Sequence, residues 1–143
     1  MSYNAFMTVV TLPAVLAILT FECFLGHRHD YSGHFAAGYG ATLGAAMFAL
    51  RIVDVAKYRS QLTWMIVPFC ILCIGGGAVA EATAFRIAKF DEVDFCNQSL
   101  GAVLATLCSI PFVYETHENT ELIDGGLVIG IAFLGIGGVL AAA

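Results

Sequence analysis

Five long apolar segments occupy nearly all of this 143-residue chain, and the charged residues are concentrated in the short gaps between them. Each apolar core is about 17 to 19 residues long, close to the roughly 20 residues that a helix needs to cross the hydrocarbon layer of a bilayer. Among the Asp, Glu, Lys and Arg residues, only Arg51 falls inside a core. The pattern therefore predicts a multi-pass integral membrane protein. The cores are Ala5–Phe21, Phe35–Val53, Leu62–Ala80, Cys96–Val113 and Leu127–Ala143.

The segments are apolar on all sides, whereas strands of a membrane barrel alternate apolar and polar residues. Backbone groups in lipid must be hydrogen-bonded within the protein, so segments of this kind form helices. We predict an all-α fold of four to five transmembrane helices in an antiparallel bundle with short loops, forming one membrane domain over residues 1–143. The short gap Tyr58–Gln61 predicts a tight hairpin between the second and third helices. The helices are expected at about 5–25, 35–57, 62–86, 96–114 and 125–143, and whether the last one spans the membrane is left open.

Composition excludes one class of partner. The chain has 6 Lys and Arg residues and no basic run, so the electrostatic footprint of a nucleic-acid-binding protein is absent. The predicted partners are membrane lipids and other membrane-protein subunits, or further copies of the chain itself. No cofactor is predicted, although bound metal, pigment or quinone is left open. The composition does not indicate which membrane holds the protein.

The densest polar stretch lies between the first and second apolar cores. It begins at Glu22 and contains three of the four histidines, His27, His29 and His34. Imidazole and carboxylate groups together suit Zn, Cu or non-haem Fe, so these four residues are the candidate ligands of a metal site. The alternative is a set of solvated side chains in an interfacial loop, because the stretch matches no established ligand motif.

Two further positions carry specific expectations. Cys23 and Cys96 lie at segment ends that should face the same side of the membrane, and they are a candidate disulfide. The alternative is two free thiols, because cysteines at similar depth need not come within bonding distance. Tyr39 lies inside a predicted helix rather than at the headgroup level, so its hydroxyl needs a partner within the protein.

Small residues recur at helical spacing in two segments. Ala36, Gly40 and Gly44 follow one another at every fourth position, and Gly126 and Gly130 repeat this spacing. In lipid, such ridges let helix backbones approach closely. Two interpretations stay open, since the ridges could join helices of this chain or face another subunit. In the second case, Gly40→Leu or Gly44→Leu would disturb association more than membrane insertion.

Three functional hypotheses follow. Tiny loops and the lack of an evident catalytic set favour a small non-catalytic structural or accessory subunit of a larger integral-membrane complex, such as an energy-transducing one. The first alternative is a self-associating, tetraspan-type membrane organiser. The second alternative is a small metal- or redox-linked membrane enzyme that uses the stretch from His27 to His34.

Overall fold

The computed structural model describes residues 2–83, 91–115 and 120–141, apart from the side chains at positions 56, 81 and 115. Five helices are present, and no strand occurs within these ranges. All five helices are long and apolar enough to cross a membrane, the last one included, which confirms the predicted all-α membrane bundle. The helices are α1 (Tyr3–Leu25), α2 (His29–Ile52), α3 (Val55–Thr83), α4 (Glu92–Glu115) and α5 (Thr120–Ala141).

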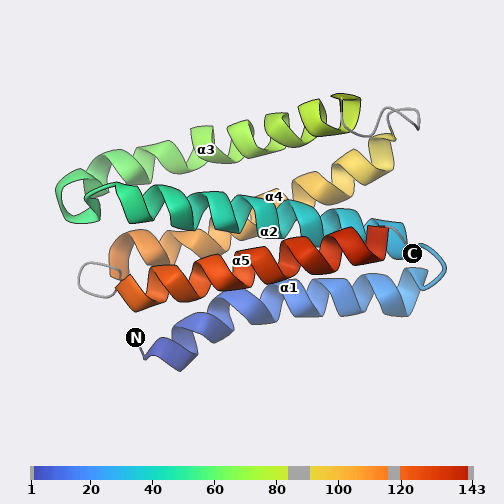
Figure 1. Cartoon of the computed structure of the whole chain (residues 1–143), viewed down its shortest axis with the longest axis horizontal. Helices are drawn as coiled ribbons and strands as arrows, with labels where there is room; N and C mark the ends of the chain where they lie inside the picture. The colour runs from blue at the N-terminus through green and yellow to red at the C-terminus, as the bar shows by residue number, and fades with distance from the viewer. Residues whose placement is uncertain (1, 84–90, 116–119, 142–143) are drawn as a thin grey trace.

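Successive helices run in opposite directions, and the two chain termini lie at opposite ends of the bundle (Figure 1). We call these the N-terminal end, which also holds the α2–α3 turn, and the C-terminal end, which also holds the α1–α2 turn. Helix α2 is central, because it packs along both α4 and α5 and also contacts α1. Helix α3 lies at the outer edge, where it packs mainly on α4. The predicted hairpin of α2 and α3 is thus antiparallel, but the two helices barely touch along their length.

The structure corrects the predicted boundaries of the second and third helices. Helix α2 begins at His29 instead of residue 35, because polar residues continue the helix beyond its apolar core, with Asp30 in the first turn. An acidic residue at this position interacts favourably with the helix dipole. The α2–α3 turn falls at Val53 and Asp54, before the predicted gap Tyr58–Gln61, but α3 is kinked within that gap at Tyr58, where φ is −110° and ψ is 15°. The Asp54 carboxylate accepts a hydrogen bond of 3.1 Å from the Lys57 backbone N–H. The predicted helix ends at 84–86 and 142–143 lie outside the described residues.

The apolar core lies between α1, α2, α4 and α5. Phe6 of α1 and Phe112 of α4 meet edge to face with ring centroids 4.1 Å apart, and both side chains are buried. Among the described residues, Val55 is the only apolar side chain of α3 that is buried. Four helices therefore form a compact core, and α3 is an outer helix attached to one side of it.

Candidate functional site

Helices α2 and α5 touch backbone to backbone. A Cβ atom added to Gly130 of α5 would lie 2.7 Å from the backbone nitrogen of Gly44, and one added to Gly40 would lie 2.5 Å from the Gly130 carbonyl oxygen. Both distances are shorter than real Cβ contacts, so no side chain larger than hydrogen fits without movement. Close approach of this kind is how helices associate in lipid, where burial of apolar surface offers no driving force. The predicted small-residue ridges therefore meet each other within one chain.

The contact has a regular antiparallel register. Gly33 lies against Ala141, Ala37 against Gly137 and Gly44 against Gly130. Toward the N-terminal end, a Cβ atom on Gly126 would meet the side chains of Met47 and Phe112 instead of backbone. The interval between small residues on α2 thus alternates between four and three positions, as expected for a helix that keeps one stripe against a neighbour.

The sequence interpretation missed part of this ridge. Ala36 is fully buried, but its neighbour Ala37 is the residue that Gly137 approaches. Gly33 was missed because the helix was expected to begin after it. The alternating four-three spacing at Gly33, Ala37, Gly40 and Gly44 is the signal that would have found both residues.

Helix α4 approaches the opposite side of α2 just as closely. A Cβ atom on Gly101 would lie 2.7 Å from the backbone nitrogen of Tyr39, and one on Gly38 would lie 2.8 Å from the backbone carbonyl carbon of Gln98. Gly101 was not identified from the sequence, because it stands alone in its segment without a second glycine at helical spacing. Glycines on two sides of α2 thus allow it to occupy the centre of the bundle.

Tyr39 connects the central helix to α1. Its side chain is completely buried, and its hydroxyl donates a hydrogen bond to the carbonyl oxygen of Val10. Its ring meets Phe133 of α5 edge to face, with centroids 5.1 Å apart. The partner that the buried Tyr39 hydroxyl needs is therefore the backbone carbonyl of Val10 on a neighbouring helix.

The polar stretch at the C-terminal end holds α1 and α2 together. Nδ1 of His29 lies 2.6 Å from Oε2 of Glu22, and the hydroxyl of Ser32 donates to the other oxygen of the same carboxylate. The Ser32 hydroxyl also lies 2.9 Å from the carbonyl oxygen of His29. Glu22 belongs to the last turn of α1, whereas His29 and Ser32 belong to the first turn of α2. These contacts close the turn between the two helices.

The four predicted metal ligands do not form one group, because only Glu22 and His29 are in contact with each other. Nε2 of His34 lies 3.5 Å from Oδ2 of Asp94 on α4, whereas His27 is exposed in the α1–α2 turn. His29 and His34 are separated because the stretch is helical, and five helical positions rotate a side chain by about 140°. Within residues 2–83, 91–115 and 120–141, no three His, Cys, Asp or Glu side chains are grouped to hold a metal ion.

The remaining charges of this stretch are paired with each other. Nη2 of Arg28 lies 2.8 Å from Oδ2 of Asp30, and the guanidinium also lies 3.9 Å from the centroid of the Tyr31 ring. Hydrogen bonding to Asp30 raises the pKa of Arg28 above its ordinary value, so this guanidinium stays charged. The candidate disulfide is not formed, since Cys23 and Cys96 are both exposed free thiols. The polar C-terminal end is thus a set of local pairs.

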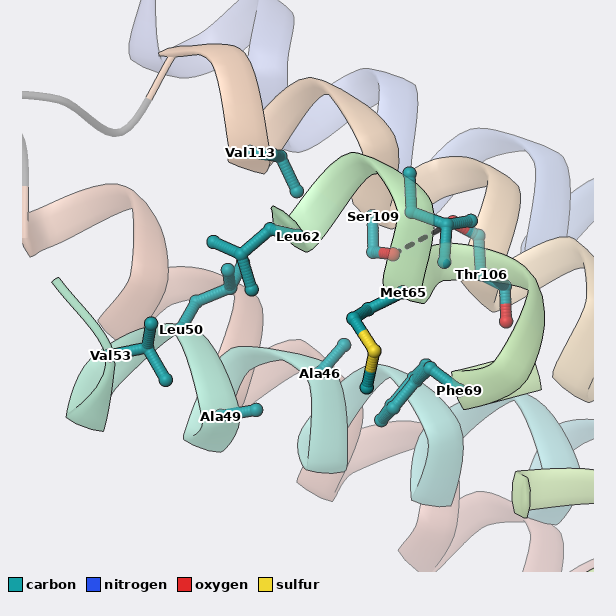
Figure 2. Close-up of a pocket in the computed structure, with 11 residues that line it drawn as sticks. Ala46, Ala49, Leu50, Val53, Leu62, Met65, Phe69, Thr106, Ser109 and Val113 are labelled. Atoms are coloured by element: carbon teal, nitrogen blue, oxygen red, sulfur yellow. Dashed lines mark hydrogen bonds between the residues drawn. The ribbon is translucent and has the colours of Figure 1, made fainter. Parts of the chain in front are cut away.

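A crevice lies between α2, α3 and α4, because α3 packs mainly on α4 and stands away from α2. Two cavities occupy this crevice, with volumes of about 240 Å³ near the N-terminal end and about 260 Å³ further along. Figure 2 shows the first one, in which Met65 and Phe69 of α3 lie over Ala46 of α2. Its lining residues come from α2, the α2–α3 turn, α3 and α4, and they are Ala46, Ala49, Leu50, Val53, Leu62, Met65, Ile66, Phe69, Thr106, Ser109 and Val113.

Comparison of the chain with protein-family models, with curated protein sequences and with solved structures gives no match. A functional proposal for this protein therefore depends on its own contacts and surfaces. Three of them stand out: the internal glycine contacts, the glycines that face away from the bundle, and the crevice beside α3.

Proposed function

We propose that this chain is a small non-catalytic accessory subunit that packs against other subunits of a larger integral-membrane complex. The observation that carries the proposal is a set of glycines that the bundle itself does not use. A Cβ atom on Gly75 or Gly76 of α3, or on Gly135 or Gly138 of α5, would meet nothing within 4 Å in the described part of the chain.

Glycine inside a helix costs about 1 kcal/mol relative to alanine, so its repeated use needs a reason. For Gly40 and Gly130 the reason is the close approach of α2 and α5. For Gly135 and Gly138, no described part of this chain lies close enough to explain the use of glycine. A helix of a neighbouring subunit, packed at the same close distance, would supply it.

The outer face of α5 has the shape that such a neighbour needs. Val128, Ile131, Gly135 and Gly138 follow at intervals of three and four positions, so they share one face of the helix. Val128 and Ile131 are both exposed. Two large apolar side chains next to two glycines create a ridge and a depression, into which another helix can insert a ridge of its own.

The organiser hypothesis shares these features, because a second copy of the chain could occupy the same face. The enzyme hypothesis has less support, since its candidate ligands are divided among separate contacts. The composition of the native assembly separates the first two hypotheses. We would extract the protein from its own membrane in mild detergent and measure the intact complexes by native mass spectrometry.

Co-migration with different polypeptides at a fixed stoichiometry is the result expected for an accessory subunit. Assemblies that contain only copies of this chain would replace the proposal with the organiser hypothesis. A chain that migrates alone under conditions that preserve other membrane complexes would overturn both.

Gly135→Leu is expected to lower the fraction of the chain found in the complex while leaving the isolated chain at least as stable as before, with a gain of up to about 1 kcal/mol because leucine is the better helix former. Leucine blocks close approach of a neighbour, yet it suits a lipid-facing helix surface. Ala45→Leu is the matched control, because Ala45 is an exposed small residue on α2. Native electrophoresis measures the fraction of the chain in the complex, and unfolding in detergent measures the stability of the isolated chain. Normal assembly of Gly135→Leu would show that the outer face of α5 is not the interface.

A further inference from the structure

The first cavity of the crevice is suited to hydrocarbon. The two hydroxyl groups in its wall are already hydrogen-bonded to backbone carbonyls of their own helix, Thr106 to Ala102 at 2.8 Å and Ser109 to Thr106 at 2.7 Å. The rest of the lining is apolar. A ligand in this cavity would therefore find no unsatisfied polar group in the side chains of the lining. If the cavity were empty, the side chains of its wall would lack dispersion contacts on that side.

Two cations lie near the start of α3, before the α3 residues that line this cavity. Arg59 precedes Leu62 by one turn on the face of α3 that lines the cavity, and Lys57 lies in the first turn of α3. The Nε atom of Arg59 is buried and has no hydrogen-bond partner among the described residues. Neither Arg59 nor Lys57 forms a salt bridge with a described carboxylate. An arginine with an unpaired, buried N–H is a donor that suits a phosphate oxygen.

The spacing between the cation and the far end of the cavity matches one leaflet of a bilayer. Ten helical positions separate Arg59 from Phe69, which corresponds to about 15 Å. Half of a hydrocarbon layer about 30 Å thick is the same length. Beyond Phe69 the lining changes character, because the second cavity includes Thr42, Gln98 and Ser99. The apolar part of the crevice thus ends where an acyl chain would end.

We propose that the crevice between α2, α3 and α4 binds an anionic phospholipid. One acyl chain fills the cavity beside Met65 and Phe69, and the phosphate group accepts hydrogen bonds from Arg59 near the start of α3, with Lys57 adding positive charge. The negative net charge of the headgroup is what distinguishes this ligand from bulk zwitterionic lipid. The bound lipid also joins the outer helix α3 to the core of the bundle.

The test uses the full chain, purified in detergent and mixed with phosphatidylglycerol and phosphatidylcholine that carry the same acyl chains. Native mass spectrometry measures how much of each lipid stays bound. We expect a preference for phosphatidylglycerol of about fivefold for the Arg59 charge alone. Arg59→Gln should remove this preference. Arg51→Gln is the matched control, because Arg51 is exposed at the same end and its Nε lies 3.8 Å from Asp124.

A second variant tests the position of the acyl chain. Ala49→Leu places a larger side chain in the cavity, and it should reduce binding of both lipids, whereas Ala132→Leu on the exposed side of α5, which lines neither cavity, should not. Thermal unfolding of each variant shows whether the bundle is intact, and Arg59→Gln decides the outcome if Ala49→Leu unfolds. Equal binding of the two lipids by the wild type, or unchanged binding by Ala49→Leu, would overturn the proposal. A dimer that excludes lipid and is lost in Ala49→Leu would overturn it as well.

Discussion

Gly40→Ala is expected to destabilise the bundle by about 3 kcal/mol, at the upper end of the usual cost of overpacking. The added methyl group would lie 2.5 Å from the carbonyl oxygen of Gly130, and the backbone nitrogen of Leu134 is nearby too. Backbone atoms in the middle of a helix cannot rotate away as the end of a side chain can. The substitution therefore forces α5 away from α2 along a contact that extends over several turns.

Gly44→Ala provides the matched comparison, because it is the same substitution four residues later on the same helix. A Cβ atom at Gly44 would meet nothing within 4 Å in the described part of the chain. Alanine is the better helix former, so this variant is expected to keep its stability or to gain up to about 1 kcal/mol. Unfolding of both variants in mixed micelles with increasing denaturing detergent gives the two values. Equal losses would show that Gly40 does not contact α5 as described.

Tyr39→Ala should cost about 3 to 5 kcal/mol, the range for removing a buried aromatic ring from a core. The ring is completely buried against Phe133, and its loss would leave a cavity between α2 and α5. Tyr39→Phe keeps the ring and removes the hydrogen bond to the carbonyl of Val10, so it should cost about 1 kcal/mol. The same unfolding measurement in micelles separates the two contributions.

Tyr114→Ala is the control for the aromatic substitution. Tyr114 is 48% exposed, and its hydroxyl lies 3.1 Å from that of Thr63 on α3. Hydrogen bonds between membrane helices contribute on average about 0.6 kcal/mol, so the loss should stay near or below 1 kcal/mol. If Tyr39→Ala proved no more damaging than Tyr114→Ala, the bundle would not have its core at Tyr39.

The length and polarity of each segment were enough to predict the helices, but not all of their ends. The apolar core of α2 begins near Phe35, whereas the helix begins at His29, because polar residues at the membrane surface can be helical as readily as apolar ones. The turn between α2 and α3 depends on the cap that Asp54 provides, and an isolated aspartate is a weak signal in a sequence. Helix ends were therefore predicted least accurately where a helix extends beyond its apolar core.

For the candidate sites too, the sequence predicted some features and missed others. The ridge residues Gly40 and Gly130 were recognised from their spacing, yet the spacing did not indicate that they face each other. The three histidines looked like one cluster along the chain, but the helical rotation of α2 directs His29 toward Glu22 and His34 toward Asp94. The crevice beside α3 had no sequence signal, because it results from how far one helix stands away from another.

The sequence by itself determined that this protein is an all-helical membrane bundle, because a segment in lipid must satisfy its backbone hydrogen bonds internally whatever surrounds it. Only the tertiary structure decided that α2 is central, that its glycines meet α5 and α4, and that α3 is left at the edge. The reason is that lipid is as apolar as the helix surfaces, so hydropathy does not direct one face of a helix toward another. The arrangement depends instead on close packing between particular backbones, and that is a property of all five helices together.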